Sequence, residues 1–185
     1  SKTGNIVAAS IALGGRPESG VADSAAGKVY INLEDKAAIA VVDLKTHKLE
    51  ATWPITGGEG PTGIALDPVL KRLIIGCANS KMVMMDSTNG KVVATLDAGQ
   101  GIDATAFDPE THLGFASGGG SGTVTIAKVE ADKLTLVQKL TTERGARTMT
   151  LDTATHKIYL SNAKSRTDTN SFKVLEYGLT EAAKP

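Results

Sequence analysis

The sequence predicts an all-β chain, a β-propeller of four-stranded antiparallel blades, and three observations lead to this fold class. One short segment that ends in aspartate occurs four times, with the marker residues Asp23, Asp67, Asp108 and Asp152. Their spacings of 44, 41 and 44 residues match a four-stranded propeller blade and exceed a leucine-rich or ankyrin unit. Apolar residues recur in short runs without a helical period, and 20 glycines suit strands joined by tight turns.

The second repeat shows most clearly how one blade is built. We expect four strands, because four short apolar runs are each bounded by turn residues. They cover residues 62–66, 73–76, 82–85 and 91–96. Asp67 and Pro68 end the first strand, since Pro68 fixes φ and the aspartate carboxylate caps the turn. Asn89 and Gly90 lie between the third and fourth strands, where a hairpin requires positive φ.

The remaining repeats follow the same plan, except that the fourth one is shorter. In the third repeat the later strands are expected at residues 113–116, 123–127 and 134–140. The fourth repeat has runs at 158–161 and 172–177 but no outermost strand. A matching strand occurs at the other end of the chain, because residues 3–11 align with residues 88–96 of the second repeat.

We therefore predict that the N-terminal strand completes the last blade, which removes sheet edges that would otherwise be open. The predicted segments are a closing strand at 3–13, blades at about 14–56, 57–98, 99–141 and 142–178, and a frayed tail at 179–185. Three arrangements satisfy this count of strands. They are a closed four-bladed ring, a ring of two chains that exchange strands, and the C-terminal part of a longer propeller with, for example, seven blades. For the chain by itself we favour the self-associated ring, because four blades leave almost no channel.

Several motifs make the chain resemble the YVTN repeat β-propeller family. They are the run from Gly60 to Pro68, the third-strand ending Val41-Val42-Asp43, and the second-strand motifs Val29-Tyr30-Ile31-Asn32 and Ile158-Tyr159-Leu160-Ser161. The resemblance covers residues from about 3 to 177. It implies a surface-layer-type propeller that is related to the quinoprotein-like propellers and comes from a bacterium or archaeon. It also implies a location in the periplasm, outside the cell or on its surface.

Charge and composition exclude several classes of function. The 20 basic and 20 acidic side chains cancel, so no global field attracts the chain to nucleic acid or to an anionic membrane. We find no apolar run long enough for a membrane span and no signal peptide. The single cysteine, Cys77, excludes an internal disulfide and is expected to be a buried small apolar residue.

Candidate binding residues lie in loops that share one end of the propeller. We name this end the channel face, and it carries the loops that lead into the innermost strands and those that join the second and third strands. The predicted ligand-binding residues are Arg16, Glu18, Thr62, Asp103, Arg144, Arg147, Lys164 and Arg166. The long loop at 162–171 distinguishes the fourth repeat, and repeat proteins place individual binding functions in such loops. Its basic residues, with Arg144 and Arg147, predict a cradle for an anion or a phosphate.

Signatures of catalysis are weak. His47, His112 and His156 fall in turns without a second ligand at metal-binding spacing, so we interpret them as turn residues. The glycine-rich run at 118–122 joins two strands and lacks the helix that a phosphate loop requires. The four marker aspartates recur in every blade, which favours turn capping over one catalytic site. Glu18 and Asp103 are the best acidic pair, because they occupy corresponding positions in different blades.

The sequence thus favours a non-enzymatic binding or scaffold protein that presents loops on its channel face. The expected partner is an unidentified protein or a small anionic ligand, and no metal or cofactor is expected. Two alternatives remain open. One is a propeller enzyme, similar to a lactonase or to a dehydrogenase subunit, with carboxylates at the channel mouth. The other is a nucleic-acid-binding propeller that uses the basic loops near the C-terminus.

Overall fold

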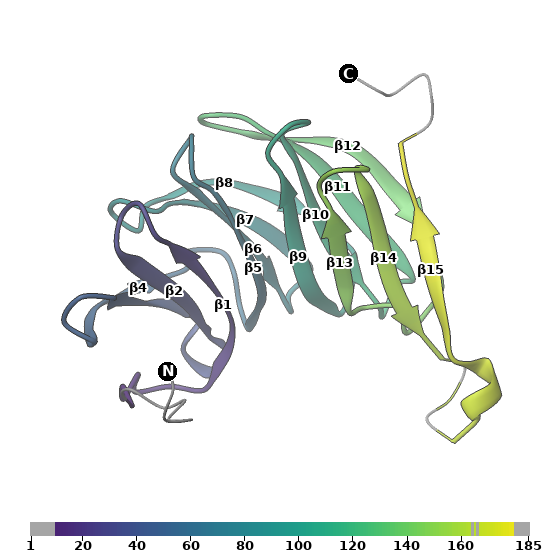
Figure 1. Cartoon of the computed structure of the whole chain (residues 1–185), viewed down its shortest axis with the longest axis horizontal. Coiled ribbons are helices and arrows are strands. Elements are labelled where there is room, and N and C mark those ends of the chain that lie inside the picture. Colours follow the sequence, from purple (N-terminus) through teal and green to yellow (C-terminus); the bar gives the residue numbers. More distant parts are fainter. Residues whose placement is uncertain (1–9, 164, 166, 180–185) are drawn as a thin grey trace, which may run out of the picture.

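The computed structural model describes residues 10–163, 165 and 167–179 and contains four antiparallel β-sheets in series (Figure 1). Blade 1 consists of β1 (Pro17–Asp23), β2 (Lys28–Leu33), β3 (Ala38–Asp43) and β4 (Lys48–Pro54). Blade 2 consists of β5 (Pro61–Asp67), β6 (Arg72–Cys77), β7 (Lys81–Asp86) and β8 (Val92–Asp97). Blade 3 consists of β9 (Ile102–Asp108), β10 (Leu113–Gly118), β11 (Thr123–Val129) and β12 (Leu134–Thr141). Blade 4 has three described strands, β13 (Met149–Asp152), β14 (Lys157–Asn162) and β15 (Lys173–Tyr177).

Each sheet follows the order of the chain, from an innermost to an outermost strand. The four sheets form an open arc, with blade 1 at one end and blade 4 at the other, instead of a closed four-bladed ring (Figure 1). The only helical segments in the described chain are the three-residue turns η1 (Glu34–Lys36) and η2 (Thr169–Ser171). Within the same residues, no helix has the length and apolar character that a membrane crossing needs.

The strands predicted from the sequence agree with the structure, and the open arc is consistent with part of a propeller. Most of the predicted closing strand, residues 3–9, lies outside the described residues. Residues 10–13 belong to no strand, and Leu13 lines a shallow hollow together with Leu33 and Ala38 of blade 1. The predicted tail at 179–185 lies almost entirely outside the described residues as well. The pairing of the N-terminal strand with blade 4 therefore stays a prediction.

Turn capping by the marker aspartates is confirmed in all four blades. Asp23 Oδ1 accepts the Ala26 amide at 3.0 Å, and Asp67 Oδ1 accepts the amides of Val69 and Leu70 at 2.9 and 3.0 Å. The two remaining caps join Asp108 to the Glu110 amide and Asp152 to the Ala154 amide. Because the carboxylate satisfies turn amides, the aspartate fixes where the innermost strand ends.

The residue that closes each of these turns has a left-handed backbone. Its φ is +66° for Gly27, +56° for Lys71, +55° for His112 and +56° for His156. His47 and Gly90 take the same conformation, with φ of +54° and +76°, in the turns that precede the outermost strands. The histidines are therefore turn residues, as the sequence predicts, and the hairpin at Asn89 and Gly90 is confirmed as well.

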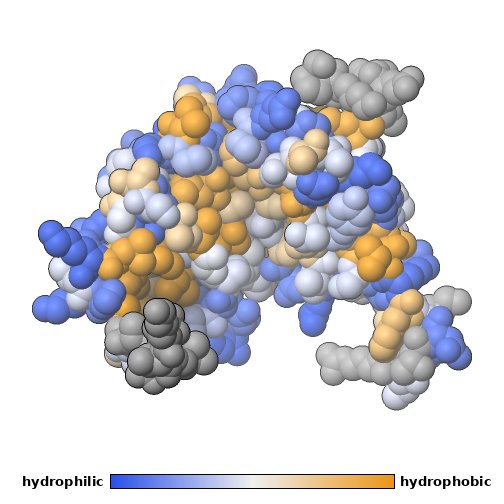
Figure 2. Space-filling view, in the orientation of Figure 1, coloured by the Kyte–Doolittle hydropathy of each residue, from blue (hydrophilic) through white to orange (hydrophobic). Residues whose placement is uncertain are grey.

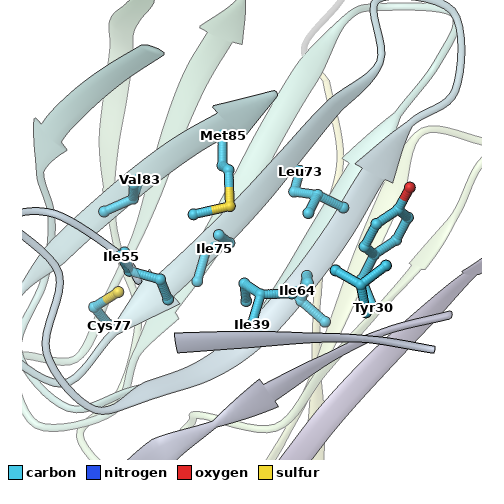
Figure 3. Close-up of a cluster of buried hydrophobic side chains, with 10 residues drawn as sticks. Tyr30, Ile39, Ile55, Ile64, Leu73, Ile75, Cys77, Val83 and Met85 are labelled. Carbon is cyan, nitrogen blue, oxygen red and sulfur yellow. The ribbon is translucent and has the colours of Figure 1, made fainter. Parts of the chain in front are cut away.

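Apolar side chains fill the space between each pair of neighbouring blades. The cluster between blades 1 and 2 includes Tyr30, Ile39, Ile64, Leu73 and Ile75, all of them buried (Figure 3). Two further clusters lie between blades 2 and 3 and between blades 3 and 4. Cys77 belongs to the first cluster, and burial raises the pKa of its thiol to about 12, so it behaves as an apolar residue. The core of the protein is thus divided among the blade interfaces.

Two polar contacts link neighbouring blades on the face opposite the channel face. His156 Nδ1 of blade 4 lies 2.7 Å from Oδ2 of Asp108 in blade 3. The Asp108 side chain is almost fully buried. Lys71 of blade 2 lies 3.8 Å from Oδ2 of Asp23 in blade 1. Burial raises the pKa of Asp108, but hydrogen bonds from His156 and the Glu110 amide outweigh it, and the pKa lies below its ordinary value. A marker aspartate can thus cap its own turn and contact the next blade.

We predict that Gly90→Val destabilises the protein far more than Gly27→Val. Both glycines have positive φ, which costs a β-branched residue about 1 kcal/mol or more. A Cβ at Gly90 would also lie 2.3 Å from Cγ of Trp53, whereas a Cβ at Gly27 meets nothing within 4 Å. Urea unfolding of both variants measures the difference. Equal losses of unfolding free energy would contradict the steric contribution of Trp53.

A second prediction concerns acid stability. Since the pKa of Asp108 is lowered by folding, its contribution to stability is present above the unfolded pKa of about 4 and is lost as the pH falls further. His156→Asn keeps a residue that tolerates positive φ but removes the contact, so the variant should lose about 1–3 kcal/mol at neutral pH. Its unfolding free energy should then fall less steeply below pH 4. His47→Asn is the control, and an identical loss in both variants would disprove the role of the contact.

Candidate functional site

The innermost strands β1, β5 and β9 and the segment just before β13 place four corresponding residues around the channel face, namely Glu18, Thr62, Asp103 and Arg147. Thr62 is structural, because its hydroxyl lies 2.9 Å from the carbonyl oxygen of Ile102 in blade 3 and 3.3 Å from that of Gly76. Ser19 donates in the same way to the Thr62 carbonyl, and Ser117 donates to the Arg147 carbonyl. Thr62, which the sequence predicts as a ligand-binding residue, therefore joins the blades.

The acidic side of the channel face lies on blade 1. A hydrogen bond between the carboxyl groups of Glu18 and Glu34 raises the pKa of Glu18. Desolvation and the charges of Glu34 and Asp103 act in the same direction, whereas Arg16 opposes them. Arg16 forms an ion pair with Glu34, and its backbone amide donates to Asp35 at 2.7 Å. Arg16 thus stabilises the carboxylates of its own blade.

The basic side of the channel face lies between blades 3 and 4. Arg147 Nε is 3.7 Å from Asp103 Oδ2, and the Thr148 hydroxyl is 3.4 Å from the same oxygen. More than half of the Arg147 side-chain surface is exposed (59%), so the guanidinium group keeps most of its donors free for other contacts. Arg144 is exposed too and lies beside Gly122. Lys164 and Arg166 lie outside the described residues.

A groove of about 1000 Å³ lies beside Arg147, between the loops of blades 3 and 4. Among the described residues that line it, the charged ones are Arg147 and Lys173, and both are basic. Thr148, Ser161 and Asn162 supply polar atoms, while Phe172 and Val174 supply exposed apolar surface. The long loop contributes Ala163 and Ser165 to the wall. The groove therefore combines positive charge, hydrogen-bonding groups and an aromatic ring.

Glu143 positions two groove residues, Lys173 and Asn162, that the sequence did not single out. Lys173 Nζ lies 2.7 Å from Glu143 Oε1, and Asn162 Nδ2 donates to Glu143 Oε2 at 2.8 Å. Asn162 is more than nine-tenths buried, and its Oδ1 has no hydrogen-bond partner. A buried amide oxygen without a partner is costly, so this position favours a donor from outside the chain. The sequence signal was the length of the loop at 162–171, which begins at Asn162.

The glycine-rich segment at 118–122 is a connection between β10 and β11, as predicted. The amide of Gly119 donates to Gly101 at 3.0 Å, and those of Gly120 and Ser121 donate to Gln100 at 2.9 and 3.3 Å. These amides are therefore not directed at a ligand. Within the described chain, no three His, Cys, Asp or Glu side chains form a group suited to a metal ion.

On the face shown in Figure 2, hydrophilic residues dominate the outer ends of the blades. Hydrophobic atoms gather over blade 1 and along the centre of the arc. The exposed large apolar side chains of the described residues include Phe172 and Val174 of the groove. Exposed apolar residues beside polar groups are typical of ligand-binding surfaces.

Comparison with known proteins shows the fold alone. No protein-family model and no curated protein sequence matches the chain. Among solved structures, hydrazine synthase of Kuenenia stuttgartiensis is similar, with a TM-score of 0.76 and 14% identity over 95% of this chain and 49% of that one. A chain of the mitotic checkpoint complex has a TM-score of 0.69 and 14% identity over 88% and 49%. A 6-phosphogluconolactonase candidate from Bacteroides uniformis has a TM-score of 0.73 and 14% identity over 92% and 55%.

These similarities confirm the β-propeller fold, and the chain spans about half the length of the structures it matches. The three similar structures carry names from different functional classes, so they do not assign an activity. A fold of this kind supports many unrelated functions, and any function must be argued from the site.

We predict that the pKa of Glu18 depends on the neighbouring carboxyl group of Glu34. Glu34→Gln removes the neighbouring negative charge, so the pKa of Glu18 should fall toward the ordinary value of about 4.3. An NMR pH titration of the Glu18 carboxyl carbon measures this value. Glu59→Gln, an exposed change on the same face of blade 2, is the control and should leave it unaltered. If Glu18 titrates identically in the wild type and in Glu34→Gln, the carboxyl pair does not form.

Proposed function

We propose that the chain is a non-enzymatic binding module and that the groove between blades 3 and 4 binds an anionic group of a small ligand or partner protein. The observation that carries this proposal is the lining of the groove, where the charged side chains among the described residues are Arg147 and Lys173. Guanidinium and ammonium groups provide charge-assisted hydrogen bonds to carboxylates and phosphates. Thr148, Ser161 and the buried Asn162 add neutral hydrogen-bonding groups.

Each cation already has an internal carboxylate neighbour, and the two contacts differ in strength. The 3.7 Å separation of Arg147 and Asp103 is longer than a hydrogen bond, so an anionic ligand competes with a weak contact there. Lys173 and Glu143 are closer, at 2.7 Å, but both side chains are more than two-fifths exposed. Solvent weakens such a pair, and a ligand can share the ammonium donors of Lys173.

The resemblance to YVTN repeat propellers belongs to the same proposal. The second-strand motifs lie in β2 and β14, where Tyr30 and Tyr159 occupy corresponding positions. We accordingly propose a location outside the cytoplasm, as is usual for that family. We also propose that the chain self-associates into a larger ring, because the described sheets form an open arc.

One observation favours the enzyme alternative. Glu18 and Glu34 share a hydrogen bond that raises the pKa of Glu18, and a carboxyl group with a raised pKa can act as a general acid. If a lactonase activity is present, hydrolysis of 6-phosphogluconolactone should be abolished in Glu18→Gln. Equal rates in the wild type and in a blank, or equal rates in the wild type and in Glu18→Gln, would leave the binding function as the better account.

We predict that Arg147→Gln combined with Lys173→Gln weakens anion binding about tenfold or more, because each cation supplies a charge-assisted hydrogen bond. Isothermal titration with citrate and with inorganic phosphate at low ionic strength measures the affinity. The control combines Lys45→Gln with Lys157→Gln on the opposite face. Lys157 is a close match to Lys173, since it also forms an exposed pair at 2.7 Å, with Glu176.

The control protein should bind the anions as the wild type does, with the same salt dependence. Equal losses of affinity in the two double variants would mean that general surface charge causes the effect, and they would refute binding in the groove. A single-stranded DNA oligonucleotide provides the remaining comparison. If it binds more tightly than citrate and with a steeper salt dependence, the nucleic-acid alternative replaces the small-anion proposal.

A further inference from the structure

A second pocket lies between blades 1 and 2, on the face opposite the channel face. Its volume is about 250 Å³, and its lining includes Asp23, Tyr30, Glu50, Trp53, Lys71 and Ser87. The pocket is formed by the turn after β1, side chains of β2, β3 and the outermost strand β4, and two turns of blade 2. It shares no lining residue with the groove between blades 3 and 4.

The wall of this pocket contains a buried carboxylate oxygen without a hydrogen bond. Asp23 is 3% exposed, and its Oδ1 accepts the Ala26 amide at 3.0 Å. Oδ2 of Asp23 has no hydrogen-bond partner. The amino group of Lys71 lies 3.8 Å away, which is beyond hydrogen-bonding distance. A buried carboxylate is stabilised when a cation with N–H groups approaches closely, and this position lacks one.

Aromatic rings form another part of the lining. The rings of Tyr30 and Trp53 are 6.0 Å apart between centroids and tilted by 31°. The Tyr30 hydroxyl donates to the Ser87 carbonyl at 2.8 Å, so the ring is held in place. Tryptophan and tyrosine faces attract cations, and they also contact alkyl chains.

Two carboxylates, Asp23 and Glu50, and two ammonium groups, Lys28 and Lys71, line the pocket. Lys28, which lines the pocket, is held by Asp43 at 3.0 Å and by Glu50. The amino group of Lys71 lies 3.8 Å from the Asp23 carboxylate. Lys28 is thus engaged by two carboxylates, and the amino group of Lys71 stays beyond hydrogen-bonding distance of Asp23. The Asp23 oxygen without a hydrogen bond therefore favours a cation over an anion at its own position.

We propose that this pocket binds the primary ammonium group of a small organic amine. The ammonium group donates a hydrogen bond to Oδ2 of Asp23, and the alkyl part of the amine lies against Trp53. An N–H donor is required, because the Asp23 oxygen without a hydrogen bond is an acceptor. Comparison with Asp67 distinguishes the proposed binding role of Asp23 from the turn-capping role that all marker aspartates share. It caps its own turn and has an unpartnered Oδ2, but it does not line this pocket.

Trp53 is the only tryptophan of the chain, so its fluorescence reports directly on the pocket. We expect n-butylammonium to change this fluorescence in a saturable manner in the wild type. Tetramethylammonium, which has charge but no N–H donor, and 1-butanol, which has no charge, should bind at least about tenfold more weakly. A response to 1-butanol as strong as that to n-butylammonium would overturn the proposal, and so would the lack of any saturable response.

Asp23→Asn keeps an oxygen that can cap the turn but removes the charge, and it should weaken n-butylammonium binding about tenfold or more. The matched variant Asp67→Asn should bind as the wild type does. Lys71→Met removes the internal cation that competes for Asp23, so binding should become tighter. If Asp23→Asn fails to fold, the affinity of Lys71→Met for n-butylammonium tests the proposal by itself. Unchanged or weaker binding in Lys71→Met, or equal losses in Asp23→Asn and Asp67→Asn, would contradict the proposal.

Discussion

The close contact between the innermost strands of neighbouring blades is the constraint on which the rest of the structure depends. A Cβ placed on Gly63 of β5 would lie 2.4 Å from the Thr105 hydroxyl and 2.6 Å from the Thr105 amide nitrogen of β9. Only a residue without a side chain permits this approach. The Thr62 hydroxyl then reaches the carbonyl oxygen of Ile102 at 2.9 Å. Toward the outer strands the blades diverge, and apolar clusters fill the widening space.

The same geometry explains why binding sites would form between blades. Loops at the two ends of a blade interface diverge as well, and the space between them is lined by residues of both blades. On the channel face this produces the groove beside Arg147, which the long loop of blade 4 extends. On the opposite face it produces the pocket beside Asp23 and Trp53. The two sites have different linings because the loops differ, while the strands that support them are repeated.

The sequence predicts the blades well, because each strand is bounded by local turn chemistry. Asp67 followed by Pro68, and Asn89 followed by Gly90, determine their turns from neighbouring residues alone. The sequence also singles out the loop at 162–171, and Asn162, Ala163 and Ser165 line the groove for which we propose binding. Its length identified it, since no other repeat contains such an insertion.

Contacts between blades could not be predicted, because they join residues far apart in the chain. His156 and Asp108 are 48 residues apart, and nothing local indicates that a turn histidine meets the buried aspartate of the preceding blade. The structural role of Thr62 was missed for the same reason, since its acceptor, Ile102, is 40 residues away. The pairing of charged side chains could not be predicted either. Arg16 and Arg147 occupy similar loops, but only Arg147 borders the groove, and Arg16 is paired with Glu34.

The most direct test of the inner-strand constraint is hydrogen exchange of the Gly63→Ala variant compared with the wild type. A methyl group at residue 63 pushes β5 and β9 apart, so the effect should appear on both sides of the interface. The account predicts that amides of β5, β6, β9 and β10 lose protection together, because the two blades are held as one unit. Loss of protection confined to β5, or unchanged exchange throughout blades 2 and 3, would contradict it.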